Sequence, residues 1–292
     1  MPRFVQFPHP APEAEPDNRN FILWNTTENH RRKFMQANGS WLEGENVKGG
    51  VMWLWGEWEP ESEVVCRIAR PKPHYPRYLY RPFYVVPICY KDLQNTDPFV
   101  FDGFFYGNCR QRRQGKRTRL CYLEPGSVVL FGSCRARKIV LDTVFVVRDW
   151  IDYDCASYGS VLKDRVPRGY VEIVLNPLCQ SGCTHKPGCA PGKGEPFRLY
   201  RGVTYADRRH FDGMFSFFPC RPRDERCEGF RRPIISGLHG IPDKPPVAYR
   251  LNLQKDLRNV QHLWECVVNK VLEKGLWLGI EAEMPERRGA KR

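Results

Sequence analysis

The chain has 292 residues, a formal net charge of +13 and an isoelectric point near 9.3. Its 41% hydrophobic and 13% aromatic content excludes a largely disordered chain and is sufficient for a substantial core. The basic balance favours a polyanionic partner, and the abundance of arginine and aromatic residues favours nucleic acid.

The composition also bears on location. No run approaches the roughly 18 apolar residues that a membrane span needs, and the amino terminus lacks the apolar segment of a secretory signal. We therefore expect a cytoplasmic protein, without a membrane partner, whose 12 cysteines are mostly reduced thiols. The sequence does not predict the oligomeric state.

In chain order, the proline-rich residues 1–20 predict an extended or disordered arm ahead of one domain over residues 21–292. A weak seam lies near 176–196. Thr27 is a plausible cap for a short helix through HRRKFMQAN, which Gly39 would end.

Strand-like runs follow. Residues 51–60 and 64–69 predict two strands, and alternation places Trp53 and Trp55 on one face with Met52 and Leu54 on the other. Residues 71–82 contain several prolines and predict a connecting loop. Further short runs rich in β-branched and aromatic residues predict strands at 83–89, 98–101, 127–133, 138–147, 171–175, 197–205 and 213–220.

One long helix is predicted over residues 256–274, where apolar residues recur every three or four positions and Gly275 follows. We expect it to cover one face of a sheet. The predicted fold class is α+β: a strand-dominated mixed sheet with one long C-terminal covering helix and few others.

Two aspartates are the candidate catalytic residues. If 138–147 is a strand, Asp142 shares a face with alternate valines, and a buried carboxylate needs either a partner or a function. Asp97 precedes a proline and follows the amides Gln94 and Asn95, which could read the edge of a base. The alternatives are a structural aspartate at 142, paired with an arginine or with N–H groups, and a turn residue at 97.

A basic loop lies between two apolar segments and predicts a cationic hairpin tip that contacts phosphates. A solvated loop is the alternative. Its cations are Arg110, Arg112, Arg113, Lys116, Arg117 and Arg119.

Aromatic residues near these groups could stack on an unpaired base, although such residues most often belong to a core. The candidates for contacting the base are Trp55, Phe99 and Tyr106.

A cysteine-rich loop offers four possible ligands of a structural zinc ion, with unligated thiols as the alternative. These are Cys179, Cys183, His185 and Cys189. Their C-x3-C-x-H-x3-C spacing departs from that of a zinc knuckle.

Three resemblances extend this interpretation. The blocks WLWGEWEP, LQNTDPFVF, GSVVLFGS and GMFSFFPC resemble an uncharacterised bacterial family associated with nucleotide modification and phage defence. QNTDPFVF is distantly similar to the water-activating loop of uracil-DNA-glycosylase-like enzymes, which implies a role for Asp97. YRG followed by FSF resembles the dinucleotide pocket of ADP-ribosyltransferases, which implies roles for Arg201 and Ser216.

The leading hypothesis is a DNA-binding enzyme that cleaves the N-glycosidic bond of a flipped or unpaired nucleotide through Asp97 and Asp142, with no organic cofactor. A non-catalytic reader of modified or single-stranded nucleic acid is one alternative. An NAD-dependent ADP-ribosyltransferase is the other.

Overall fold

A computed structural model describes residues 1–8, 32–68, 75–86, 96–135, 138–180, 196–226, 228–238, 253–254 and 257–289. Strands dominate it and form mixed sheets with few helices, so the predicted α+β class is confirmed. Within the described part of the chain, no helix is long and apolar enough to cross a membrane.

The first sheet has six strands in the order β13-β1-β9-β10-β11-β6, with β1 parallel to β9 and the other neighbours antiparallel. Its strands are β1 (Arg3–Pro8), β6 (Phe105–Tyr106), β9 (Val128–Arg135), β10 (Lys138–Tyr153), β11 (Phe197–Gly202) and β13 (Leu253–Gln254). The expected amino-terminal arm is corrected at residues 3–8, which form a strand because Phe4, Val5 and Phe7 are buried in the core. Residues 9–20 lie outside the described residues.

The second sheet has seven strands, and β14 pairs with both β12 and β2, so that β14, β12, β3 and β2 form a closed ring. Its strands are β2 (Lys33–Glu43), β3 (Asn46–Gly56), β4 (Ser62–Arg67), β5 (Tyr78–Val85), β12 (Phe218–Pro222), β14 (Trp277–Ala282) and β15 (Glu286–Arg288). The predicted loop over 71–82 is therefore wrong from Tyr78 onward.

The predicted helix through HRRKFMQAN is wrong, because residues 33–43 pair along their whole length with β3. Gly39 is needed for a reason other than ending a helix. A Cβ atom there would lie 2.1 Å from the carbonyl oxygen of Glu281, so only glycine allows β14 to approach this closely. Tertiary pairing overrides the local helix signal.

Helices are few and mostly short. They are α1 (Tyr158–Val161), α2 (Arg168–Tyr170), α3 (Asn176–Gln180), α4 (Leu257–Leu272), the 3₁₀ helices η1 (Arg119–Tyr122) and η3 (Ala206–Phe211), and the π-helical turn η2 (Val171–Leu175).

The predicted strand over 171–175 is wrong, because these residues continue α2 into α3. Tyr170, Ile173, Val174 and Leu178 are buried, and this spacing of three and four is helical.

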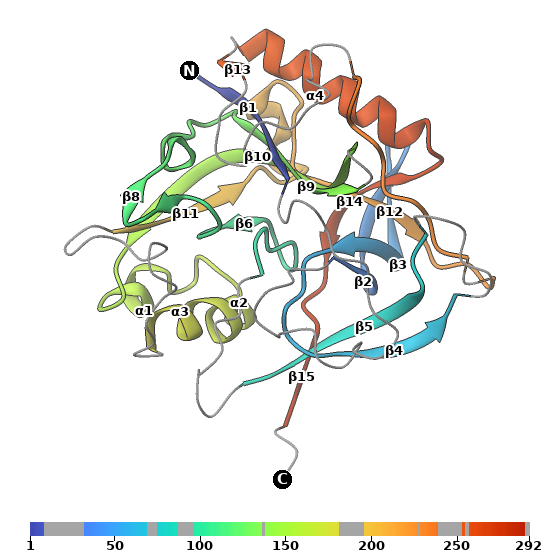
Figure 1. Ribbon diagram of the computed structural model, residues 1–292, viewed down its shortest axis with the longest axis horizontal. Coiled ribbons are helices and arrows are strands. Elements are labelled where there is room, and N and C mark those ends of the chain that lie inside the picture. Colours follow the sequence, from blue (N-terminus) through green and yellow to red (C-terminus); the bar gives the residue numbers. More distant parts are fainter. Residues whose placement is uncertain are drawn as a thin grey trace.

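The first sheet is covered on both faces. One face packs on α4, whose Val260, Leu263 and Val267 join the core around Val128 and Leu130, as expected of a covering helix. The other face packs on aromatic residues of segment 99–106 and on the helices at 158–180. Figure 1 shows α4 along one edge of the molecule and α1–α3 on the opposite side of these strands.

The predicted alternation in β3 is confirmed. Met52 and Leu54 belong to the core on the side of the 99–106 segment, whereas Trp53 and Trp55 belong to the core on the side of α4.

Candidate functional site

The basic loop folds as a small hairpin, β7 (Arg112–Arg113) and β8 (Lys116–Arg117). Gln114 and Gly115 form its turn with φ angles of 51° and 75°, the left-handed pair that suits a two-residue hairpin. The sequence suggested that the two flanking segments pair with each other. They do not, because β6 pairs with β11 instead. The cationic hairpin tip therefore exists, but it is built from the basic residues themselves.

Arg112 anchors this hairpin to the body of the protein. Its guanidinium donates to the carbonyl oxygen of Gly115 at 3.2 Å and to that of Pro196 at 2.8 Å. Arg112 is buried and Arg117 half-buried, whereas the other four cations of the loop are exposed. The exposed cations are Arg110, Arg113, Lys116 and Arg119.

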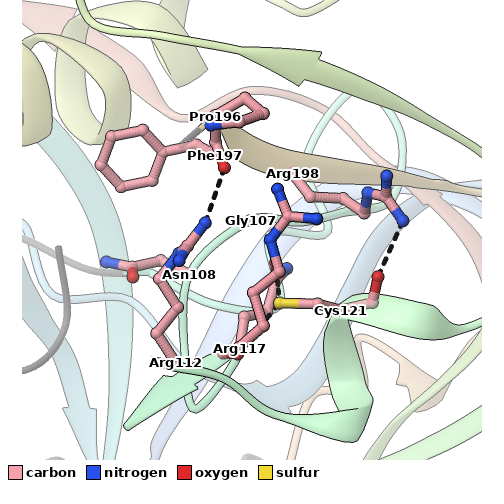
Figure 2. Close-up of a pocket in the computed structure, with 9 residues that line it drawn as sticks. Gly107, Asn108, Arg112, Arg117, Cys121, Pro196, Phe197 and Arg198 are labelled. Carbon is pink, nitrogen blue, oxygen red and sulfur yellow. Dashed lines mark hydrogen bonds between the residues drawn. The ribbon is translucent and has the colours of Figure 1, made fainter. Parts of the chain in front are cut away.

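A pocket lies between the hairpin and β11. Arg112, Arg117 and Arg198 bring guanidinium groups to it from three different strands, and Asn108 contributes an amide. Figure 2 shows the three arginine side chains around Cys121, with Arg198 joined to the Cys121 carbonyl oxygen. The full lining is Gly107, Asn108, Gln111, Arg112, Arg117, Cys121, Pro196, Phe197 and Arg198, and none of these residues is acidic.

Two contacts fix Arg198 in this pocket. It forms a bidentate pair with Asp152, at 2.7 Å and 2.6 Å, and donates to the carbonyl oxygen of Cys121 at 2.7 Å. The positive charge of the three arginines also acts on the thiol: burial raises the pKa of Cys121, while Arg112, Arg117 and Arg198 oppose the rise. The three arginines therefore place positive charge around the pocket, and the Asp152 carboxylate offsets part of it.

Asp97 lies beneath the segment that forms this pocket. Its carboxylate is 2% exposed and accepts three backbone N–H groups, from Gly107 at 3.0 Å, Asn108 at 2.8 Å and Cys109 at 2.6 Å. Burial raises its pKa to about 6, against the lowering effect of these N–H groups and of Arg32. Asp97 therefore holds the backbone of 107–109 in place, which is a structural role different from the turn residue offered as the alternative.

A buried ionic cluster surrounds Asp142. Its carboxylate lies 2.8 Å from Arg32 Nε and 3.0 Å from Arg232 Nη1. Arg32 also pairs with Glu57, and Arg232 donates to Ser133 Oγ at 2.9 Å. All four charged side chains are 3% exposed or less. Two guanidiniums balance two carboxylates, which is the structural role that the sequence left open for Asp142.

Asp142 is also the extra residue of a β-bulge, because the register with β9 shifts between Leu141 and Thr143. The bulge inverts the alternation, so Leu141 and Val144 both face the core beside α4. The predicted face of alternate valines with Asp142 is therefore wrong.

The aromatic candidates lie in the core. Phe99 and Tyr106 are fully buried and Trp55 is 6% exposed. The Trp55 indole donates to the carbonyl oxygen of Phe230 at 2.9 Å, and the Tyr106 hydroxyl donates to that of Cys109 at 2.7 Å. These rings are therefore core residues, which was the alternative to stacking on a base. Gln94 and Asn95 lie outside the described residues.

The residues of the ADP-ribosyltransferase resemblance are engaged elsewhere. Arg201 forms a bidentate pair with Asp149, at 2.6 Å and 2.7 Å. Ser216 is fully buried, and its hydroxyl exchanges hydrogen bonds with the backbone of Val146. A dinucleotide has no access to that hydroxyl.

The expected zinc site loses a ligand, because Cys179 forms a disulfide with Cys155. A sulfur in a disulfide is not the thiolate that zinc requires. Cys183, His185 and Cys189 lie outside the described residues. Among the residues that are described, no group of three or more His, Cys, Asp or Glu could hold a metal ion.

The Cys155–Cys179 disulfide makes the expected cytoplasmic location testable, because disulfides persist mainly in oxidising compartments. Non-reducing peptide mapping of protein from its native cells, with free thiols alkylated during lysis, is expected to recover one peptide that joins the two cysteines. If both are alkylated instead, the protein is kept reduced, as the cytoplasmic expectation requires.

Arg198 was missed by the sequence analysis although it completes the pocket. Alternation offered a signal: Phe197 and Leu199 are buried, which places Arg198 on the opposite face of the strand. Nothing in the sequence pairs that face with the hairpin.

No family model, no curated protein and no solved structure matches this chain.

Proposed function

We propose that this protein binds nucleic acid and that the phosphate backbone lies along the β7–β8 hairpin, with one phosphate at the mouth of the pocket of Arg112, Arg117 and Arg198. The observation that carries the proposal is the convergence of these three guanidiniums in a pocket without an acidic lining residue. Arginine suits phosphate because its planar donors bind two oxygens at once. DNA is the favoured nucleic acid, and the exposed cations of the loop extend the positive surface beyond the pocket.

This proposal is for a reader rather than an enzyme. Asp97 and Asp142 are held by backbone N–H groups and by arginines respectively, and neither lines the pocket. Cleavage of an N-glycosidic bond remains a separate proposal. Its support would be a free base released from DNA by the wild-type protein and not by Asp97→Asn.

The test replaces the four exposed cations, Arg110, Arg113, Lys116 and Arg119, with glutamine. We expect the affinity for DNA to fall on the order of 100-fold at moderate salt, and the slope of log K against log salt to decrease by about 3, because each lost phosphate contact removes nearly one counterion from the exchange. Fluorescence anisotropy with a labelled oligonucleotide at several salt concentrations measures both quantities.

The matched control removes the same charge elsewhere, with Lys48, Arg67, Lys138 and Lys274 replaced by glutamine; all four are exposed. It should lose much less affinity. Equal losses in the two variants would mean that net charge alone drives binding and would contradict a site at the hairpin.

A further inference from the structure

Trp150 is an exposed aromatic residue in contact with Arg198, which lines the pocket. Its neighbours Ile151 and Tyr153 are buried, whereas 39% of Trp150 remains exposed. Aromatic residues are enriched at recognition surfaces, and this one contacts an arginine of the pocket.

The tryptophan ring is held in a fixed orientation. The Arg198 guanidinium lies 4.8 Å from the ring centroid, and Tyr200 contacts it edge-on, with 6.4 Å between centroids and 67° between planes. Arg198 is itself fixed by Asp152 and by the carbonyl oxygen of Cys121. One arginine therefore lines the pocket and supports the ring.

A second exposed aromatic residue follows Cys121 in the chain. Tyr122 is 51% exposed and directly follows Cys121, whose carbonyl oxygen binds Arg198. The backbone N–H of Leu123 donates to the Tyr200 hydroxyl at 3.1 Å, which ties this segment to β11. The backbone next to Tyr122 is therefore fixed to the same strand and arginine that contact Trp150.

We infer that Trp150 stacks on unpaired bases, so that the ligand is single-stranded nucleic acid. This inference rests on the proposed function, since the phosphates would bind at the arginine pocket. Bases of a duplex are stacked on each other and offer no free face, whereas bases of a single strand do. An aromatic residue beside a cationic groove is the combination that single-strand binders use.

The experiment compares three ligands of about 15 nucleotides: an oligothymidine, an abasic oligonucleotide of equal length and charge, and a duplex. We expect wild-type protein to bind the oligothymidine about tenfold more tightly than the abasic strand. Trp150→Ala should lose about tenfold on the oligothymidine and nothing on the abasic strand. Trp150→Phe should retain most of the affinity, because phenylalanine also stacks.

The outcomes separate the two proposals. Equal wild-type affinity for the oligothymidine and the abasic strand, or equal losses on both in Trp150→Ala, would overturn base stacking and leave phosphate binding intact. Preference for the duplex would also overturn it. The absence of salt-dependent binding to any of the three would reject the nucleic-acid proposal itself. An unchanged melting temperature in Trp150→Ala shows that the variant is folded, so that any loss of affinity comes from the missing surface side chain.

Discussion

Asp142→Ala is expected to lower the free energy of unfolding by about 3–5 kcal/mol, because it leaves two buried guanidiniums with one carboxylate between them. Arg32 and Arg232 both lie within 3.0 Å of the Asp142 carboxylate, and all three side chains are almost fully buried. Urea denaturation followed by tryptophan fluorescence measures the loss. Arginine remains charged in proteins, so the excess positive charge cannot be relieved by deprotonation.

Asp152→Ala on the same strand is the matched control. Asp152 also binds an arginine, but its side chain is 36% exposed, and a surface pair of this kind contributes about 1 kcal/mol or less. If both variants lose equally little, Asp142 is not needed for the fold. That result would favour the hypothesis that Asp142 is a catalytic residue.

The double variant Asp142→Leu with Arg232→Met extends the argument. It removes one charge of each sign and leaves Arg32 paired with Glu57. Replacing both members of a buried pair with apolar residues is much less costly than removing one. We therefore expect the double variant to be more stable than Asp142→Ala, and a sum of two independent losses would contradict the ionic cluster.

The elements that could be predicted are those in which apolar residues recur with a clear helical or strand period over a sufficient length. The helix α4 shows apolar residues at spacings of three and four, and β3 shows strict alternation at Met52–Trp55, so both were predicted. Two errors had a common cause. In both segments the local signal is overridden: residues 33–43 pair with β3, and residues 171–175 continue the helix from α2 into α3 and pack into the core.

The sequence predicted the charged residues of the candidate site but not how they are arranged in space. The cations of the 110–119 loop are visible as a run in the sequence. Their convergence with Arg198 depends on β11 lying beside the hairpin, a contact between residues about eighty positions apart. The two carboxylates were instead assigned a catalytic role although they have structural contacts. A sequence does not show that Asp97 binds three N–H groups or that Asp142 lies at a bulge.

Asp97 provides a second stability test. Asp97→Ala leaves the backbone N–H groups of Gly107, Asn108 and Cys109 without their acceptor. At about 1 kcal/mol or more for each buried donor, we expect a loss of at least about 3 kcal/mol. Gly107 and Asn108 line the pocket, so the variant should also weaken phosphate binding. Denaturation and anisotropy on the same preparation measure both, and a stable variant with unchanged binding would contradict the role of Asp97.

The pH dependence of the same residue has a definite sign. Burial raises the pKa of Asp97 to about 6 in the folded protein, above the value of about 3.9 in an unfolded chain. Between about pH 4 and pH 6 the folded state therefore binds the extra proton, and the contribution of Asp97 to stability falls by up to about 3 kcal/mol as pH rises. Asp97→Asn does not titrate, so the stability of the wild type relative to this variant should decrease across that window. A difference that increases with pH would mean that the three N–H donors outweigh burial. Asp97 would then be an ordinary ionised carboxylate, and its hydrogen bonds would hold the 107–109 segment most firmly at neutral pH.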